Sequence, residues 1–66
     1  MTIVVNGAAR EVEEGDTVAR LLERLELGGR WALVERNGRP VERAAYAETE
    51  LADGDVLVIA RPVAGG

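Results

Sequence analysis

The sequence predicts a two-layer α+β domain in which a mixed sheet of four to five strands packs on one helix. Strand-like runs lie near both ends of the chain, and one amphipathic helix lies near the middle. A helix with a single apolar stripe must bury that stripe against another element, and here the sheet is that element. At 66 residues, the chain is expected to form one domain, residues 1–66, with one small core.

Two strands are expected before the helix. The first covers residues 2–6, where three consecutive β-branched aliphatic residues precede the turn signal Asn6-Gly7. The second, around residues 9–13, returns antiparallel to the first. Glu14-Gly15 is expected to end this second strand.

The helix follows from apolar residues at positions i, i+3, i+4 and i+7. These residues are Val18, Leu21, Leu22 and Leu25. Asp16 or Thr17 is expected to cap the first turn. Gly28-Gly29 is expected to provide the left-handed residue that ends the helix.

The second half of the chain predicts three more strands. Residues 31–36 form one, Asn37-Gly38 is a hairpin turn, and residues 39–41 return briefly because Pro40 suits an edge. Residues 56–60 are apolar throughout, which is typical of a central strand, and the first and last strands should pair in parallel. The predicted core contains Ile3, Val5, Leu21, Leu22, Leu25, Val34, Leu57 and Ile59.

One face of this sheet has no helix to cover it. We expect Val4, Leu33, Val58 and Ala60 on that face. An apolar cluster on an uncovered face is typical of a partner-binding site. Singly exposed apolar strand residues are also ordinary, and the pattern alone leaves both interpretations open.

The C-terminal residues 62–66 are expected to form a flexible tail. Pro62 cannot donate a ladder hydrogen bond and should end the last strand. Val63 and Ala64 follow, and Gly65-Gly66 then end the chain at a free carboxylate without side chains that would widen it. The alternative is an ordinary frayed terminus.

Composition argues against several functions. The chain has no histidine and no cysteine, so the usual bases and nucleophiles of catalysis near neutral pH are missing, and neither an enzyme nor a metal site is expected. A net charge of −4 argues against nucleic-acid binding. No signal peptide or membrane-spanning run is evident, so we expect a cytoplasmic protein without a membrane partner.

The order of elements, together with the terminal diglycine, resembles the ubiquitin-like β-grasp fold. The motifs resemble more closely the ThiS family of sulfur carriers in thiamine biosynthesis. They run in order along the chain: Val5-Asn6-Gly7, Thr17-Val18-Ala19, Leu21-Leu22, residues 32–38, Val41, Arg43, residues 51–55 and Gly65-Gly66. The tail, however, lacks the three glycines common in that family and is similar to that of the molybdopterin synthase small subunit.

The resemblance implies a carrier chemistry at Gly66. An ATP-dependent, ubiquitin-activating-like enzyme would adenylate the terminal carboxylate, and a persulfide sulfur would displace AMP to leave a thiocarboxylate. An acceptor enzyme such as thiazole synthase would then take the sulfur. The carrier itself would bind no cofactor, because ATP is bound by its activating partner.

Other functions stay open at this point. The chain could serve molybdopterin synthesis or another sulfur-containing metabolite with the same chemistry. A ubiquitin-like modifier conjugated to lysines would use the same adenylation step. A plain interaction or RNA-binding module would have no use for the diglycine.

Overall fold

Five strands and one α-helix make up the part of the chain that the computed structural model describes, residues 1–27 and 32–61. The α+β class predicted from the sequence is confirmed. The elements are β1 (Thr2–Val5), β2 (Ala8–Glu11), α1 (Val18–Arg24), β3 (Leu33–Arg36), β4 (Arg39–Val41), the 3-10 turn η1 (Arg43–Ala45) and β5 (Val56–Ala60).

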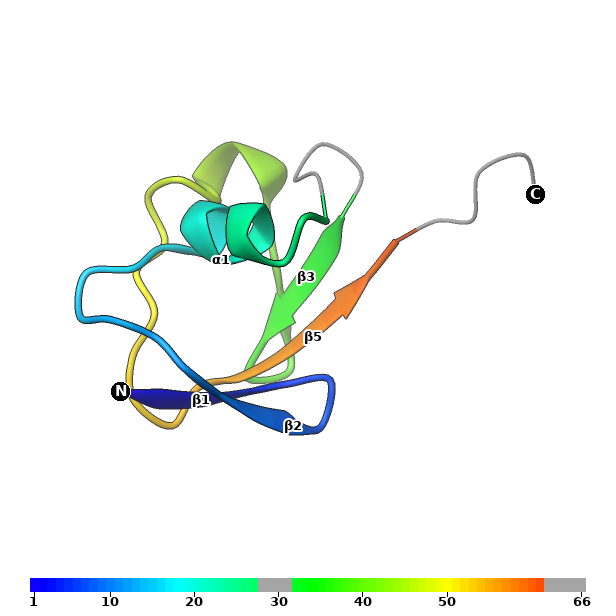
Figure 1. Ribbon diagram of the computed structural model, residues 1–66. Helices are drawn as coiled ribbons and strands as arrows, with labels where there is room; N and C mark the ends of the chain where they lie inside the picture. Colours follow the sequence, from blue (N-terminus) through cyan, green and yellow to red (C-terminus); the bar gives the residue numbers. More distant parts are fainter. Residues whose placement is uncertain (28–31, 62–66) are drawn as a thin grey trace.

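The strands form one mixed sheet in the order β2-β1-β5-β3-β4, and α1 packs over one of its faces (Figure 1). β1 and β5 are parallel neighbours, with Val4 opposite Val56, and the other pairs are antiparallel. The predicted pairing of the first and last strands is therefore confirmed. β5 lies at the centre of the sheet and ends on the opposite side of the molecule from the N-terminus (Figure 1).

Both Asn-Gly pairs form the hairpin turns that the sequence predicts. Asn6 and Gly7 have φ of 50° and 85°, and Asn37 and Gly38 have φ of 53° and 83°. Two successive residues with positive φ are the signature of a type I′ turn, whose twist matches that of the flanking strands. The two strands of each hairpin are thus joined by a turn of the same type.

The core lies between α1 and the inner face of the sheet. The predicted core residues are buried, except that Leu25 is only partly buried. Val18 of the predicted helix stripe is buried as expected, and the structure adds Val12, Ala32, Tyr46 and Leu51 to the core. Tyr46 is tolerated there because its hydroxyl donates a 2.8 Å hydrogen bond to the carbonyl of Ala32.

The helix begins as expected and ends earlier than expected. Thr17 caps it, since its hydroxyl accepts a hydrogen bond from the backbone N–H of Arg20 at 3.2 Å. The left-handed residue after the helix is Glu26, with φ of 57°, and the Leu27 N–H bonds back to the Leu22 carbonyl at 3.1 Å. This is a Schellman motif, so the prediction that Gly28-Gly29 ends the helix is wrong.

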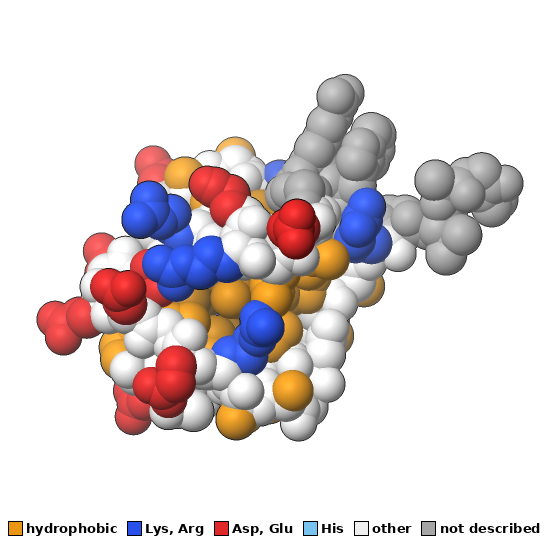
Figure 2. Space-filling view, in the orientation of Figure 1, with side chains coloured by type: hydrophobic (Ala, Val, Ile, Leu, Met, Phe, Trp, Pro, Cys, Tyr) orange, Lys and Arg blue, Asp and Glu red, His pale blue; other side chains and the backbone are white. Residues whose placement is uncertain are grey.

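The surface shown in Figure 2 carries basic and acidic side chains interspersed, with hydrophobic side chains visible between them. A nucleic-acid-binding surface is expected instead to gather its basic residues on one face. Among the described residues, no helix is both long and apolar enough to cross a membrane.

Candidate functional site

The outer face of the sheet, opposite α1, carries the predicted apolar cluster. Leu33 and Val58 are 51% and 49% exposed, Ala60 is exposed, and Val4 is half-buried. The structure adds Val56, which is 47% exposed. From here on, 'the outer face' means the surface formed by these five residues, which are Val4, Leu33, Val56, Val58 and Ala60.

Strand pairing brings the outer face together. Val4 lies opposite Val56 across the β1–β5 pair, and Leu33 lies opposite Ala60 across the β3–β5 pair. Because side chains alternate along a strand, residues 56, 58 and 60 point to the same side of β5. The predicted residues therefore form one continuous apolar band across three strands.

Part of this band is hollowed into a groove of about 310 Å³. Its lining comes from β3, β4 and β5 and consists of Leu33, Val34, Glu35, Pro40, Val41, Val58 and Ala60. The lining is mainly apolar, and Glu35 is its one ionisable member. Such a surface suits an apolar anchor of a partner protein with a polar contact beside it.

The outer face leads directly to the C-terminal segment. Ala60, the last residue of β5, belongs to the outer face and is followed by Arg61, the last residue described. The whole predicted tail, residues 62–66, lies outside the described residues, and with it the tail site residues Val63, Ala64, Gly65 and Gly66. A partner bound on the outer face would therefore meet the chain at the point where the tail begins.

A buried carboxylate fixes the other end of β5. Asp55 is 5% exposed and accepts hydrogen bonds from Nε of Arg36 at 2.8 Å, Nδ2 of Asn37 at 3.0 Å and the N–H of Ala52 at 2.8 Å. Burial opposes the charged form, but these hydrogen bonds outweigh it and hold the pKa of Asp55 below its ordinary value. The β3–β4 hairpin is thereby tied to the start of β5.

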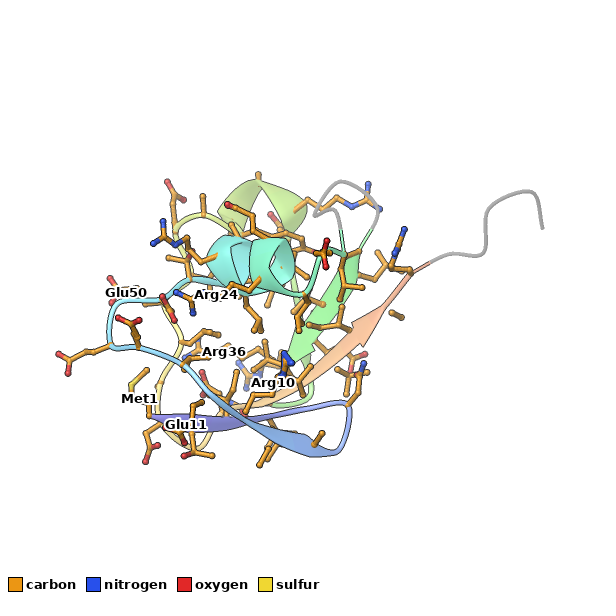
Figure 3. The ribbon with its side chains drawn as sticks, in the orientation of Figure 1. Met1, Arg10, Glu11, Arg24, Arg36 and Glu50 are labelled. Carbon is orange, nitrogen blue, oxygen red and sulfur yellow. The ribbon has the colours of Figure 1, made fainter. Side chains whose placement is uncertain are left out.

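A second carboxylate holds the helix to the segment before it. Both oxygens of Asp16 accept hydrogen bonds from Arg24, and one also accepts from the N–H of Glu13 at 2.8 Å. Figure 3 shows Arg24 extending from α1 toward that segment. The hydrogen bonds from Arg24 and then Glu13 lower the pKa of Asp16. Both carboxylates thus have structural partners that account for their burial.

Within residues 1–27 and 32–61, no group of three or more His, Cys, Asp or Glu residues is arranged to hold a metal ion.

Five residues of this surface were not among the predicted binding residues: Val56 on the outer face, and Val34, Glu35, Pro40 and Val41 in the groove. Val56 has the same parity as Val58 and could have been included on that ground. Glu35 and Pro40 share the groove because they are paired across the β3–β4 hairpin. That pairing follows from the two-residue turn at Asn37-Gly38, which was the signal available in the sequence.

Comparison with known proteins places the chain among sulfur carriers. The model of the ThiS family matches residues 3–66. The sulfur carrier protein ThiS of Escherichia coli K12 is 33% identical over 66 residues, covering both chains completely. A thiazole synthase of Paramagnetospirillum magneticum is 38% identical over 66 residues, and the chain spans only 20% of the length of that relative.

Solved structures agree with this assignment. A crystal structure of the thiamine biosynthesis protein ThiS from Geobacter metallireducens superimposes with a TM-score of 0.82 at 33% identity, covering both chains completely. A solution structure of a thiamine biosynthesis protein from the same organism gives a TM-score of 0.81 at 33% identity, covering 100% of this chain and 88% of the other. The fold, the matched residues and the similarity over the whole chain lead to one conclusion: the protein belongs to the ThiS family, with its ubiquitin-like β-grasp fold.

Proposed function

We propose that this protein is a sulfur carrier of thiamine biosynthesis and that the carboxylate of Gly66 carries the sulfur. The observation that supports this most is the continuity of the outer face with Arg61, in a ThiS-family chain whose sequence ends in Gly65-Gly66. A partner enzyme would thus bind the folded domain through the outer face and bind the tail at the same time.

The carboxylate needs activation because it is a poor electrophile. One of its oxygens attacks the α-phosphorus of ATP, which forms an acyl adenylate and releases pyrophosphate. A persulfide sulfur then attacks the acyl carbon and AMP leaves. A second thiol cleaves the sulfur–sulfur bond of the resulting acyl disulfide, so that a thiocarboxylate remains on Gly66 and the two thiols end as a disulfide.

The outer face would dock the ATP-dependent adenylating enzyme. Leu33 and Val58 line the groove and are half-exposed, as expected for anchors that become buried on binding. The enzyme would bind ATP, and the carrier would contribute only the surface and the tail. These steps would take place in the cytoplasm, where ATP is available.

Thiazole synthase is the sulfur acceptor that the comparisons favour. The relative of that name contains, within one fifth of its length, a segment similar to this entire chain. Joining a carrier-like segment and a thiazole synthase in one polypeptide places donor and acceptor at a high effective concentration. A separate carrier would reach the same acceptor by binding it.

Adenylation followed by sulfur transfer gives a product with one terminal oxygen of Gly66 replaced by sulfur. Intact mass spectrometry of the carrier after incubation with ATP, the adenylating enzyme and a sulfur donor would detect this replacement. Conjugates to lysine side chains in place of the thiocarboxylate would instead indicate a protein modifier.

A further inference from the structure

The side chain of Asn6 extends the hydrogen-bond ladder of β5 beyond the point where β1 ends. In the β1–β5 pair, the backbone N–H of Val4 bonds to the Asp55 carbonyl and that of Asn6 bonds to the Leu57 carbonyl. The chain then turns away at Asn6-Gly7, so the backbone of β1 no longer reaches the next rung. That rung is Ile59.

The carboxamide of Asn6 takes the place of the missing strand. Its Oδ1 accepts a hydrogen bond from the Ile59 N–H at 2.8 Å, and its Nδ2 donates one to the Ile59 carbonyl at 3.0 Å. Both backbone groups of Ile59 are thereby satisfied by one side chain. The β1–β2 turn and the carboxyl end of β5 lie on the same side of the molecule (Figure 1).

Asn37 has an equivalent position at the other end of β5. Its backbone N–H donates to the Val56 carbonyl at 2.7 Å, and its Oδ1 accepts from the Val56 N–H at 2.9 Å. The two asparagines thus hold opposite edges of β5, Asn37 where the strand begins and Asn6 just before it ends at Ala60. Only Asn6 lies next to the point where the tail leaves the domain.

We propose that Asn6 is a positioning residue, which fixes the direction in which the C-terminal segment leaves β5. Without the Asn6 carboxamide, the last residues of β5 would be hydrogen-bonded to β3 only and would separate more easily from the sheet. The Gly66 carboxylate would then reach the adenylating enzyme in the correct place less often. This inference rests on the carrier function proposed above.

Glycine at position 6 removes both hydrogen bonds and still permits the positive φ of the turn. In Asn6→Gly we expect kcat for adenylation to fall about tenfold, within the hundredfold that a misplacement of about 1 Å can cost. KM should stay near that of the wild type, because the outer face is unchanged. Hydrogen exchange at the Ile59 and Arg61 amides should also become faster than in the wild type.

Asn37→Gly is the control at the other end of β5: it changes a turn of the same type and removes the side-chain hydrogen bonds to the Val56 N–H and to Asp55, far from the tail. We expect it to leave kcat and KM unchanged, even where its loss of stability equals that of Asn6→Gly. If Asn6→Gly does not fold, Asn6→Asp serves instead: it keeps the acceptor for the Ile59 N–H and replaces the donor to the Ile59 carbonyl by an oxygen. The same fall in kcat is expected.

Wild-type kcat in the Asn6 variant would overturn the positioning role, and so would an equal fall in the Asn37 variant. A separate variant, lacking Gly66, tests the carrier function. If that variant is inactive while Asn6→Gly keeps wild-type kcat, only the inference about Asn6 fails. If the variant lacking Gly66 is charged with sulfur at the wild-type rate, the proposed carrier function is wrong. The inference about Asn6, which rests on that function, is then wrong as well.

Discussion

Asp55 and Arg36 form a partly buried ion pair in which Oδ2 of the carboxylate accepts a 2.8 Å hydrogen bond from Nε of the guanidinium. The pair lies where the β3–β4 hairpin meets the start of β5, and the amide of Asn37 completes it. The loop before β5 joins the same cluster through the Ala52 N–H. A single carboxylate therefore connects the β3–β4 hairpin to the start of β5 and to the loop just before it.

This relationship predicts how stability depends on pH. The pKa of Asp55 in the folded state lies below its unfolded value, which is near 3.9. The contribution of Asp55 to the free energy of unfolding is therefore complete above the unfolded pKa and is lost as pH falls through the folded-state pKa. Asp55→Asn should lower the free energy of unfolding at pH 7 and should flatten its decline below about pH 4. Urea denaturation across this pH range measures both effects. Wild-type and variant curves that stay parallel would contradict the assignment.

The helix end gives a second prediction. Glu26 adopts a left-handed conformation, which disfavours a residue with a side chain by about 1 kcal/mol or more. Glu26→Gly should therefore raise the free energy of unfolding by about 1 kcal/mol. Glu23→Gly, on the exposed side within α1, is the control and should lower it by about the same amount. A loss of stability in both variants would show that the Glu26 conformation is not strained.

The outer face gives a third prediction. Leu33→Glu places a charge in the lining of the groove, and we expect it to weaken binding to the adenylating enzyme by more than about 1 kcal/mol while the fold is kept. Ala44→Glu adds the same charge at an exposed position on η1 and should leave binding unchanged. Isothermal titration calorimetry compares the two variants. Wild-type affinity in Leu33→Glu would place the interface elsewhere.

Much of the fold could be predicted because its signals are local. The β-branched run before Asn6 and the apolar run from Val56 marked the two parallel strands, and each Asn-Gly pair marked a type I′ turn. The second strand begins at Ala8, one residue before the expected start, because the turn has only two residues. The parity of each strand then assigned four of the five outer-face residues, all except Val56.

The features that were missed depend on contacts between distant parts of the chain. Asn6 and Ile59 are 53 positions apart, so the sequence shows Asn6 only as a turn residue. Tyr46 can be buried because its hydroxyl donates a hydrogen bond to the carbonyl of a distant residue, Ala32. The helix end is a local feature that was also missed: Schellman hydrogen bonds close the helix after Arg24, whereas the preference of glycine for the left-handed position favoured Gly28-Gly29.

The tail predicts a gradient of tolerance to side chains. Gly65→Val should prevent charging with sulfur, because a β-branched side chain would obstruct a narrow channel in the enzyme and restrict the backbone. Ala64 already carries a methyl group, so Ala64→Gly should be charged at the wild-type rate. Intact mass spectrometry measures the charging of both variants with sulfur. Equal charging of Gly65→Val and Ala64→Gly would contradict a narrow channel at position 65.

Charging of a variant that lacks Gly66 is the most direct test of the carrier function. Deleting this residue moves the terminal carboxylate back by up to about 3.6 Å, away from the α-phosphate of ATP. The variant and the wild type are incubated with ATP, the adenylating enzyme and a sulfur donor, and thiocarboxylate formation is followed by intact mass. The account predicts that the wild type gains sulfur and the variant does not; charging of both at the same rate would contradict it.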